Sequence, residues 1–195
     1  MKLLAETRLP TAFGTFDLLA FESEFDDFPH VVLRSLVASN EDSVNVRVHS
    51  ECMTGDVFGS RRCDCGEQLH TALDVFGQAG GLLIYLRQEG RGIGLVNKIK
   101  AYNLQDEGLD TIKANHALGF HADERDYEPA IAILKTLGIS KIRLYTNNPE
   151  KVDAFKETGI EVLERVSIEI EPNTENASYL RTKRQDMGHF LRLIK

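Results

Sequence analysis

The first third of the chain has the residue pattern of β-strands. Its apolar stretches, rich in β-branched or aromatic residues, are TAFGTFDLLAF (11–21), HVVLRSLVA (30–38) and SVNVRVHS (43–50). The last of them alternates between valine and polar residues, as a strand with one buried face does. Arg47 and His49 fall on the same face, and we expect both to point toward polar surroundings just before Cys52.

From Glu67 onward the pattern changes to alternating helices and strands. Leu69, Leu73 and Phe76 recur at helical spacing until Gly80-Gly81 ends the helix. The later predicted elements are a strand covered on both faces at LLIYL (82–86), a helix over about 94–106, a loop-rich stretch to Phe120, a helix over 128–137, a strand at KIRLYT (141–146), a helix capped by Asn147-Asn148-Pro149 that runs to Thr158, and a strand at IEVLERVSIEI (160–170).

This order of elements predicts an α/β (α+β) fold, with a largely β N-terminal part followed by alternating helices and strands in one compact domain. A length of 195 residues suits one such domain. We expect residues 1–170 to form its main part, and residues 171–195 to form a C-terminal helix or mobile tail of the same domain.

The charge balance narrows the classes of partner. A net charge of −7 argues against a nucleic-acid or anionic-membrane binder, because such proteins carry a basic excess. The segment 87–100 departs from this balance, with four cations against Glu89 as its one anion, which suggests a small anionic ligand. The sequence shows neither a signal peptide nor an apolar run that could cross a membrane, so we expect a cytoplasmic protein.

All three cysteines lie in one short window, with the spacing Cys-x10-Cys-x-Cys that joins Cys52, Cys63 and Cys65. An odd number argues against a disulfide framework. Thiolates are soft ligands that suit zinc, and three protein ligands leave the fourth position of a catalytic zinc site open for water. We expect the adjacent Arg61 and Arg62 to favour the thiolate form of Cys63.

Three other interpretations of the cysteine cluster stay open. Three inert buried thiols are one, although the loop is polar and punctuated by glycines. A structural zinc would take a fourth protein ligand, which His49 or His70 could supply, and would make the chain a binding module. The sequence His49-x-Glu51 is similar to the H-x-E of zinc deaminases, in which the glutamate is acid and base, but the matching P-C-x-x-C is absent.

One glycine-rich stretch is a candidate for binding phosphate. RQEGRGIGLVNKIK (87–100) interleaves glycines with Arg91, after a buried strand and before a helix. Free N–H groups at a helix N-terminus and a guanidinium both suit a phosphate group. A solvated tight turn before an amphipathic helix is the alternative.

Two more stretches carry charged residues in suggestive positions. YTNNPEK (145–151) places Lys151 where a strand ends and a helix starts, which is where α/β sheets bind ligands. An ordinary helix cap with an exposed lysine fits the same residues. In HADERDY (121–127), Asp123 and Arg125 would share one face of an extended loop, although such charge runs are usually solvated surface.

Together these stretches resemble the GTP cyclohydrolase II family, whose members open riboflavin biosynthesis. The matching stretches follow the family's order over most of the chain: RVHSECMTGDVFGSRRCDCGEQL, YLRQEGRGIGLVNKIKAYNLQDEGLDTIKAN, LGFHADERDY, TNNPEK and YLRTKRQDMGH. The cysteine spacing and RQEGRGIGL are the most specific of them. Bifunctional relatives carry a synthase domain ahead of this one, and the chain is too short for it, so it looks like the stand-alone form.

The resemblance implies that GTP is hydrolysed to 2,5-diamino-6-(5-phosphoribosylamino)pyrimidin-4-one, formate and pyrophosphate. It also implies a homodimer with one Zn²⁺ per chain, held by the three cysteines, and Mg²⁺ on the triphosphate. Tyr102 matches the active-site tyrosine, Asp123 the proton acceptor, and Arg125 the nucleophile toward the α-phosphate. Residues that match GTP contacts are Arg47, Val48, His49, Ser50, Glu51, Gln68, Glu89, Gly90, Arg91, Thr111, Thr146 and Lys151.

Elementary chemistry agrees with most of these roles. The Glu89 carboxylate could accept hydrogen bonds from the guanine N1–H and amino edge. Arg125 is a difficult nucleophile because a guanidinium stays protonated, so we expect it mainly to stabilise charge on the α-phosphate unless Asp123 takes its proton. Without the resemblance, the pattern would favour Tyr102 as a core aromatic on one stripe of a helix. A different purine or pyrimidine hydrolase on the same scaffold is a rival function for the whole chain.

Overall fold

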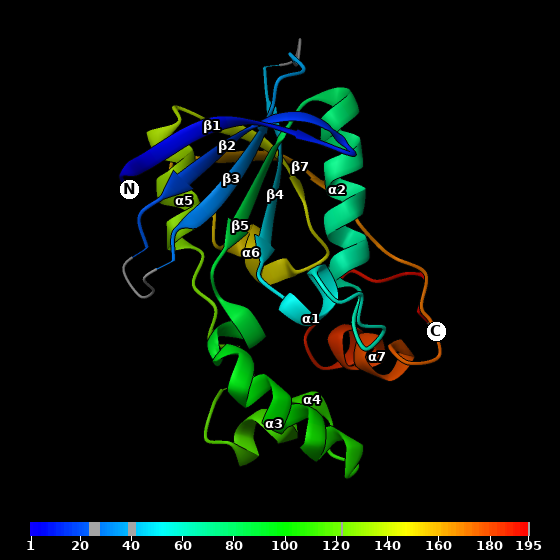
Figure 1. The fold of residues 1–195 in the computed structure, drawn as a ribbon. Helices are drawn as coiled ribbons and strands as arrows, with labels where there is room; N and C mark the ends of the chain where they lie inside the picture. Colours follow the sequence, from blue (N-terminus) through cyan, green and yellow to red (C-terminus); the bar gives the residue numbers. More distant parts are fainter. Residues whose placement is uncertain (24–27, 39–41, 122, 195) are drawn as a thin grey trace. The chain divides into compact units, whose positions relative to one another are not determined.

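The structure is a computed structural model that describes residues 1–23, 28–38, 42–121 and 123–194. Its strands are β1 (Leu3–Thr11), β2 (Gly14–Phe21), β3 (His30–Ser35), β4 (Val44–Ser50), β5 (Leu82–Leu86), β6 (Lys141–Tyr145) and β7 (Glu161–Val166). Its helices are α1 (Met53–Asp56), α2 (Cys65–Ala79), the 3-10 turn η1 (Glu89–Gly92), α3 (Gly94–Asp106), α4 (Thr111–Ala117), α5 (Glu128–Thr136), α6 (Pro149–Asp153) and α7 (Ala177–Gln185) (Figure 1).

The strands of the described residues form one mixed sheet in the order β1-β2-β3-β5-β4-β6-β7. The pairs β1–β2, β2–β3 and β3–β5 are antiparallel, whereas β4–β6 and β6–β7 are parallel. A mixed sheet with helices in the second part of the chain confirms the predicted α/β class. Because β4 and β6 are parallel neighbours, the residues that follow them emerge at the same edge of the sheet.

The described chain divides into two compact units that interleave along the sequence. The first consists of residues 1–49, 68–87 and 127–168 and carries the sheet; the second consists of residues 50–67, 88–126 and 169–195. The three cysteines and α7 belong to the second unit. The predicted division at residue 170 stays a prediction, and Lys195 lies outside the described residues.

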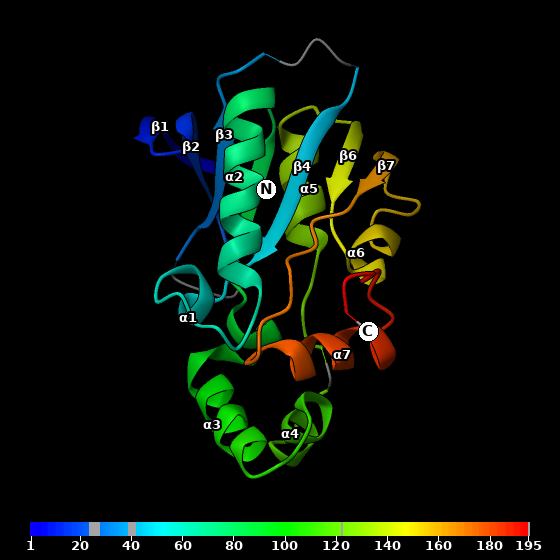
Figure 2. The same ribbon diagram turned by 90° about the vertical axis from the view of Figure 1, so that its right-hand side faces the viewer.

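Both faces of the sheet are covered within the first unit, by α2 on one side and α5 on the other (Figure 2). Leu82, Ile84 and Leu86 of β5 pack in the core that contains α5, whereas Leu83 packs with Phe76 of α2. This explains why LLIYL is a continuous apolar run, as expected for a strand buried on both faces. No helix among the described residues combines the length and the apolar character needed to span a bilayer.

The strongly periodic elements lie where the sequence predicts them. Strand β5 and helix α3 have the expected bounds, and α5 and β6 each end one residue early. Helix α2 starts two residues before the expected position, at Cys65. The alternation in β4 is also present, but its polar face is buried: Asn45 donates to the Gly80 carbonyl at 3.0 Å, because α2 covers this face.

One strand was missed, and the predictions for four other stretches were wrong. Strand β1 was missed because LLAETRLPT is largely exposed at the sheet edge and shows no clear alternation, and residues 11–21 turned out to contain the β1–β2 turn. The stretch before Phe120 contains α4, capped by Asp110, whose side chain accepts from the Lys113 N–H. Helix α6 begins with its predicted Asn148 cap but ends at Asp153, and β7 ends at Val166.

Candidate metal centre and nucleotide site

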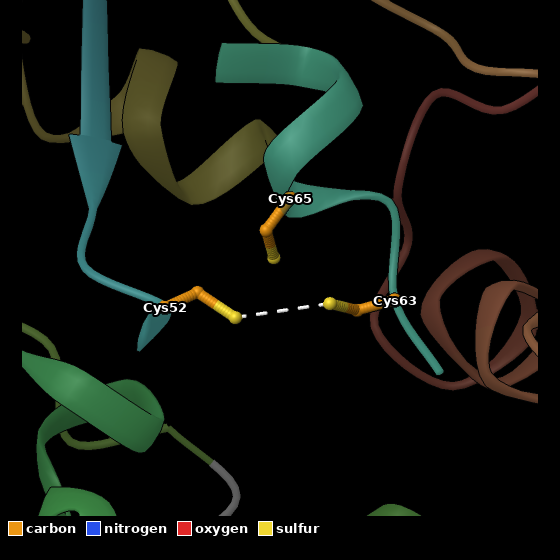
Figure 3. A group of neighbouring side chains, drawn as sticks. All are labelled: Cys52, Cys63 and Cys65. Atoms are coloured by element: carbon orange, nitrogen blue, oxygen red, sulfur yellow. Dashed lines mark hydrogen bonds between the residues drawn. The ribbon is translucent and has the colours of Figure 1, made fainter. Parts of the chain in front are cut away.

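Three thiols converge in the second unit and form a candidate metal centre. Cys52 follows β4, Cys63 lies in the loop before α2, and Cys65 begins α2 (Figure 3). Their sulfur atoms lie within 4.8 Å of one another, and the Cys52 and Cys63 sulfurs are 3.7 Å apart. Zinc–sulfur bonds of about 2.3 Å in a tetrahedron require sulfur–sulfur distances of roughly 3.8 Å. The donor set and its spacing therefore fit zinc.

The backbone around the thiols is shaped to bring them together. The Cys52 N–H donates to the Asp56 carboxylate at 3.0 Å, which closes the α1 turn. A Cβ added at Gly55 would lie 2.9 Å from the Cys63 sulfur and 3.3 Å from the Cys52 sulfur. The Cys52 and Cys63 sulfurs and the Cys65 Cβ can lie this close to residue 55 only because it has no side chain.

Lys98 of α3 supplies a buried positive charge beside this cluster. Its ammonium lies 3.1 Å from the Cys52 sulfur and 2.8 Å from the Glu89 carboxylate. Burial alone would lower the lysine pKa, but the Cys52 thiolate and Glu89 outweigh it and raise that pKa. The Cys52 pKa is lowered, chiefly by hydrogen bonds from the other two thiols and with help from Lys98.

Two expectations about cations near the cysteines were wrong. Arg62 does not favour the Cys63 thiolate, because its guanidinium bonds Asp106 at 2.8 and 2.9 Å, and the Cys63 pKa is raised to about 11 by its bond to Cys52. The four cations of segment 87–100 do not form one surface patch either. Lys98 is buried against the thiols, whereas the guanidinium of Arg87 lies 5.1 Å from the ring centroid of Phe28.

Tyr102 lies one helical turn beyond Lys98 and faces the same cluster. Its hydroxyl is 3.4 Å from the Thr54 hydroxyl, which is 3.7 Å from the Cys52 sulfur. Burial raises the tyrosine pKa to about 12, so the phenol stays protonated at neutral pH. A core stripe does not account for this residue, because Ile99 on the same helix is 49% exposed.

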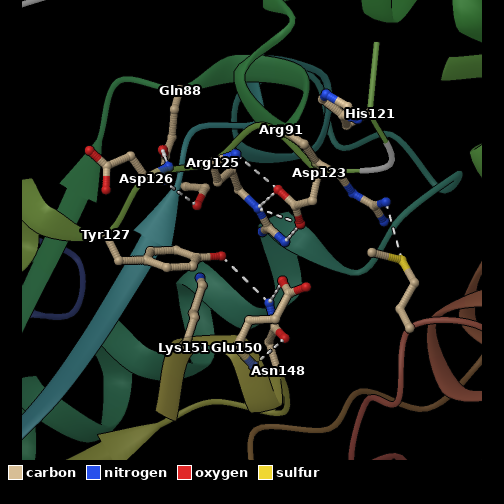
Figure 4. A network of polar contacts seen from close by, with 12 residues as sticks. Gln88, Arg91, His121, Asp123, Arg125, Asp126, Tyr127, Asn148, Glu150 and Lys151 are labelled. Atoms are coloured by element: carbon tan, nitrogen blue, oxygen red, sulfur yellow. Dashed lines mark hydrogen bonds and ion pairs between the residues drawn. The ribbon is translucent and has the colours of Figure 1, made fainter. Parts of the chain in front are cut away.

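Asp123 and Arg125, which we expected to share one face of the loop, are ion-paired in the second unit (Figure 4). The Arg125 Nε donates to the Asp123 Oδ1 at 2.8 Å, and a second guanidinium nitrogen reaches Oδ2. Burial would raise the Asp123 pKa, but Arg125 and the nearby Arg91 hold it below its usual value. Asp123 is therefore a carboxylate at neutral pH. Ala122, within the same predicted stretch, lies outside the described residues.

Gln88 ties this loop to the segment before the cysteines. Its side-chain nitrogen donates to the Ser50 hydroxyl at 2.9 Å, and its oxygen accepts from the Asp126 N–H at 3.2 Å. One side chain thus holds two candidate substrate-contacting segments in register within the second unit.

The glycine-rich stretch forms η1, with residues in the left-handed backbone region. Gly90 and Arg91 have φ values of 64° and 62°. The Arg91 carbonyl accepts from the Glu124 N–H at 3.1 Å, and a Cβ at Gly92 would come within 2.8 Å of the Glu124 carbonyl oxygen. Gly92 is therefore needed for packing against the loop that carries Asp123. The Arg91 guanidinium also donates to Tyr179 of α7 at 3.4 Å.

Within the first unit, predicted GTP contacts gather at the ends of β4 and β6. Arg47 donates to the Gln68 side chain at 2.6 Å and to the Tyr145 carbonyl at 2.9 Å. The Lys151 ammonium donates to the Val48 carbonyl at 2.7 Å and is only 4% exposed. The alternative of an exposed lysine at an ordinary cap is therefore wrong.

The remaining predicted contacts are placed as follows. Thr146 is buried in the first unit, where its hydroxyl accepts from the Asn148 N–H at 3.0 Å. Glu51 is buried beside Cys52 in the second unit, and Thr111 begins α4 there. The group of three thiols includes no histidine; within the first unit His49 stacks on Tyr85 and His70 packs against Phe13.

Comparison with known proteins decides the family. A family model described as GTP cyclohydrolase II matches residues 2–167. The chain belongs to the GTP cyclohydrolase II family. It is 54% identical over 187 residues to the riboflavin biosynthesis protein RibBA of Chlorobium phaeovibrioides, an alignment that covers 95% of this chain and 46% of that protein. RibBA of Bacillus cytotoxicus is 52% identical over 189 residues, covering 96% of this chain and 48% of that protein.

The chain spans about half the length of the curated relatives it matches. Among solved structures, RibBX, a two-domain 3,4-dihydroxy-2-butanone 4-phosphate synthase from A. baumannii, aligns with 85% of this chain and 40% of that chain. The TM-score is 0.44 and the identity 15%, a likeness too weak to support any conclusion about this GTP cyclohydrolase II family member.

Sequence reasoning missed three residues of this GTP cyclohydrolase II centre. Gly55 and Thr54 lie inside the quoted cysteine stretch, but nothing in their spacing indicates a contact with sulfur. Lys98 was counted as part of an anion-binding patch. Lys98 lies in the metal centre because the turn of η1 brings Glu89 and α3 together. No local sequence pattern predicts that turn.

Proposed function

We propose that the chain hydrolyses GTP with opening of the guanine imidazole ring. The products are 2,5-diamino-6-(5-phosphoribosylamino)pyrimidin-4-one, formate and pyrophosphate, in the first step of riboflavin biosynthesis. The observation that carries the proposal is a cluster of three convergent thiols, beside a protonated tyrosine, in a chain of the GTP cyclohydrolase II family.

In this proposal Cys52, Cys63 and Cys65 hold one zinc ion per chain. Bound there, zinc supplies Lewis-acid chemistry and an activated water for attack on C8 of guanine. A group of three protein ligands supports a catalytic site over a structural one, because catalytic zinc keeps an open position. The balance of the reaction requires two waters at C8, one to open the ring and one to release formate, and a third at the α–β phosphoanhydride.

Tyr102 acts in the ring-opening half. Its phenol, protonated at neutral pH, can donate a hydrogen bond to a reacting atom or hold a water in place. The Thr54 hydroxyl, 3.4 Å away, fixes the direction of the phenol oxygen. We expect this pair to orient the second hydrolytic step, in which the ring-opened formamide is cleaved.

Asp123 and Arg125 act in the phosphate half. The ion pair and the lowered Asp123 pKa support charge stabilisation by Arg125, since a carboxylate with a lowered pKa is a poor acceptor for a guanidinium proton. Arg125 then neutralises charge that develops on the α-phosphate during cleavage. Mg²⁺ on the triphosphate oxygens complements it, because phosphate oxygens are the hard ligands that Mg²⁺ prefers.

Each unit, taken by itself, holds residues that we propose as GTP contacts. The first contributes Arg47, Val48, His49, Gln68, Thr146 and Lys151; the second contributes Ser50, Glu51, Glu89, Gly90, Arg91 and Thr111. Glu89 already accepts from the N–H groups of Met53 and Gly90, both at 2.6 Å, and from Lys98. We therefore assign it chiefly to shaping this segment, with any contact to the guanine edge made through its remaining lone pairs.

Metal removal and reconstitution test the proposal. The purified protein is stripped with a chelator, and GTP turnover with Mg²⁺ is followed before and after zinc is added back, with the pyrimidinone identified by mass. We expect formate release to disappear on stripping and to return with about one zinc per chain. Full formate release by the stripped protein would exclude the zinc role. The proposed homodimer is checked on the same samples by light scattering.

A further inference from the structure

We propose that Lys98 is a positioning residue of the metal centre: it binds the Cys52 sulfur and so adjusts the charge that the three thiolates present to the metal. The inference rests on the proposed zinc site. The roles proposed above for the cysteines, Tyr102 and Arg125 do not involve this lysine.

The contacts of Lys98 are specific and buried. The residue is 9% exposed, with its ammonium 3.1 Å from the Cys52 sulfur and 2.8 Å from Glu89 Oε1. Glu89 is itself held by the N–H groups of Met53 and Gly90, at 2.6 Å each. The Glu89 carboxylate thus holds the Lys98 ammonium in place, and the ammonium contacts the Cys52 sulfur. A lysine that served only to pair with Glu89 would not need to contact a thiol.

The net charge of the zinc-loaded cluster explains what the contact between Lys98 and Cys52 can do. Three thiolates and Zn²⁺ sum to one negative charge, and so much donation from sulfur weakens the metal as a Lewis acid. A charged N–H donor draws electron density from the sulfur that it bonds. Groups outside the ligand set commonly orient ligands and tune a metal in this way. Lys98 contacts one of the three sulfurs, so Cys52 becomes the weakest electron donor of the set.

The experiment compares zinc affinity in four proteins: the full chain, Lys98→Met, the double variant Lys98→Met with Glu89→Gln, and Lys100→Met. Lys100 is an exposed lysine on the same helix and provides the matched control. Affinity is measured by competition with a chromophoric chelator in the absence of GTP. We expect Lys98→Met to bind zinc about 10- to 100-fold more weakly, because the loaded cluster then keeps a buried negative charge with no cation beside it, a loss that outweighs the stronger donation from Cys52. Lys100→Met should match the parent chain.

The double variant separates the two roles that Lys98 can have. It removes both buried charges, so no glutamate is left unpaired. Affinity that stays low in the double variant supports action on the sulfur. Affinity that returns to the parent value shows that the lysine only neutralises Glu89, and overturns the proposal. Parent-like affinity in Lys98→Met alone overturns it as well.

Cobalt substitution gives a second readout that a purely structural role would not move. Loss of the N–H···S bond makes the Cys52 thiolate a better donor, so the thiolate-to-cobalt charge-transfer band of Lys98→Met should shift to lower energy. A band at the parent position contradicts the proposal. GTP turnover of the parent chain is measured in parallel: a zinc-loaded parent that fails to release formate rejects the proposed function alone, whereas the affinity series still decides on Lys98.

Discussion

Replacing Gly55 with alanine is the sharpest local test of the metal centre. The added Cβ would lie 2.9 Å from the Cys63 sulfur, 3.3 Å from the Cys52 sulfur and 3.2 Å from the Cys65 Cβ. Favourable contacts to carbon begin at about 3.5 Å. The sulfurs of Cys52 and Cys63 must therefore move by several tenths of an ångström, or the α1 turn must shift away from them.

The expected loss follows from the tolerance of a metal site. Ligand distances in zinc sites hold to within about 0.2 Å, so displacements of this size spoil the geometry. Overpacking a tight contact costs about 1–3 kcal/mol. If that cost falls on the metal-bound state, zinc affinity drops roughly 5- to 150-fold, since each 1.4 kcal/mol is a factor of ten.

Chelator competition measures this affinity directly, with Gly59→Ala as the control. Gly59 lies in the segment that follows α1, with a φ of 63° and no atom within 4 Å of an added Cβ. Alanine there costs about 1–2 kcal/mol of backbone strain without approaching a thiol. The control should keep its zinc affinity although its stability falls. Parent-like zinc binding by Gly55→Ala would refute the assignment of Gly55 to the metal centre.

Other changes have equally definite outcomes. Tyr102→Phe keeps the buried ring and loses the hydroxyl, so formate release should slow by about 100-fold or more while pyrophosphate release persists; equal slowing of both would remove the tyrosine from the ring-opening half. Lys183→Met breaks a 2.7 Å ion pair with Asp64, whose side chain is 2% exposed, and should cost about 3–5 kcal/mol in urea unfolding; a loss below about 1 kcal/mol would show a pair no stronger than a surface one. Burial and the nearby Lys183 lower the His189 pKa from 6.5 to about 3. The unfolded chain then binds that proton first, so stability falls as pH drops below 6.5 toward 3. His189→Gln should flatten that part of the stability curve, and an unchanged slope would count against the assignment.

Periodic patterns made much of the fold predictable. LLIYL and the α3 stretch were assigned with the correct bounds because a doubly covered strand and a glycine-started helix each leave a local signature. Strand β1 has no such signature. Most of its side chains are exposed at the sheet edge, so its sequence does not alternate between apolar and polar residues. The polar face of β4 was misjudged for the opposite reason: its polar residues are buried under α2, a contact between distant parts of the chain.

In the candidate site, too, features set by local sequence were predicted and a contact between distant parts of the chain was not. Cysteine spacing indicated three metal ligands, and the structure brings their sulfurs together. The separation of Asp123 and Arg125 by two residues indicated a shared face of the loop, and the structure shows that the two side chains form an ion pair. The positive charge beside the thiols was assigned to Arg61 and Arg62, which are near Cys63 in sequence, whereas the Lys98 ammonium is the one that contacts a sulfur. Adjacency in sequence does not determine which cation folding brings to a buried sulfur.

In the proposed function, the chain opens the guanine ring and cleaves the phosphoanhydride of the same GTP molecule. The most direct measurement incubates the zinc-assayed protein with GTP and Mg²⁺ and quantifies formate and pyrophosphate together, beside the Cys52→Ser variant. We predict equal amounts of the two products from the parent chain and no formate from the variant. Formate from Cys52→Ser at the parent rate, or neither product from a zinc-loaded parent chain, would contradict the proposed function.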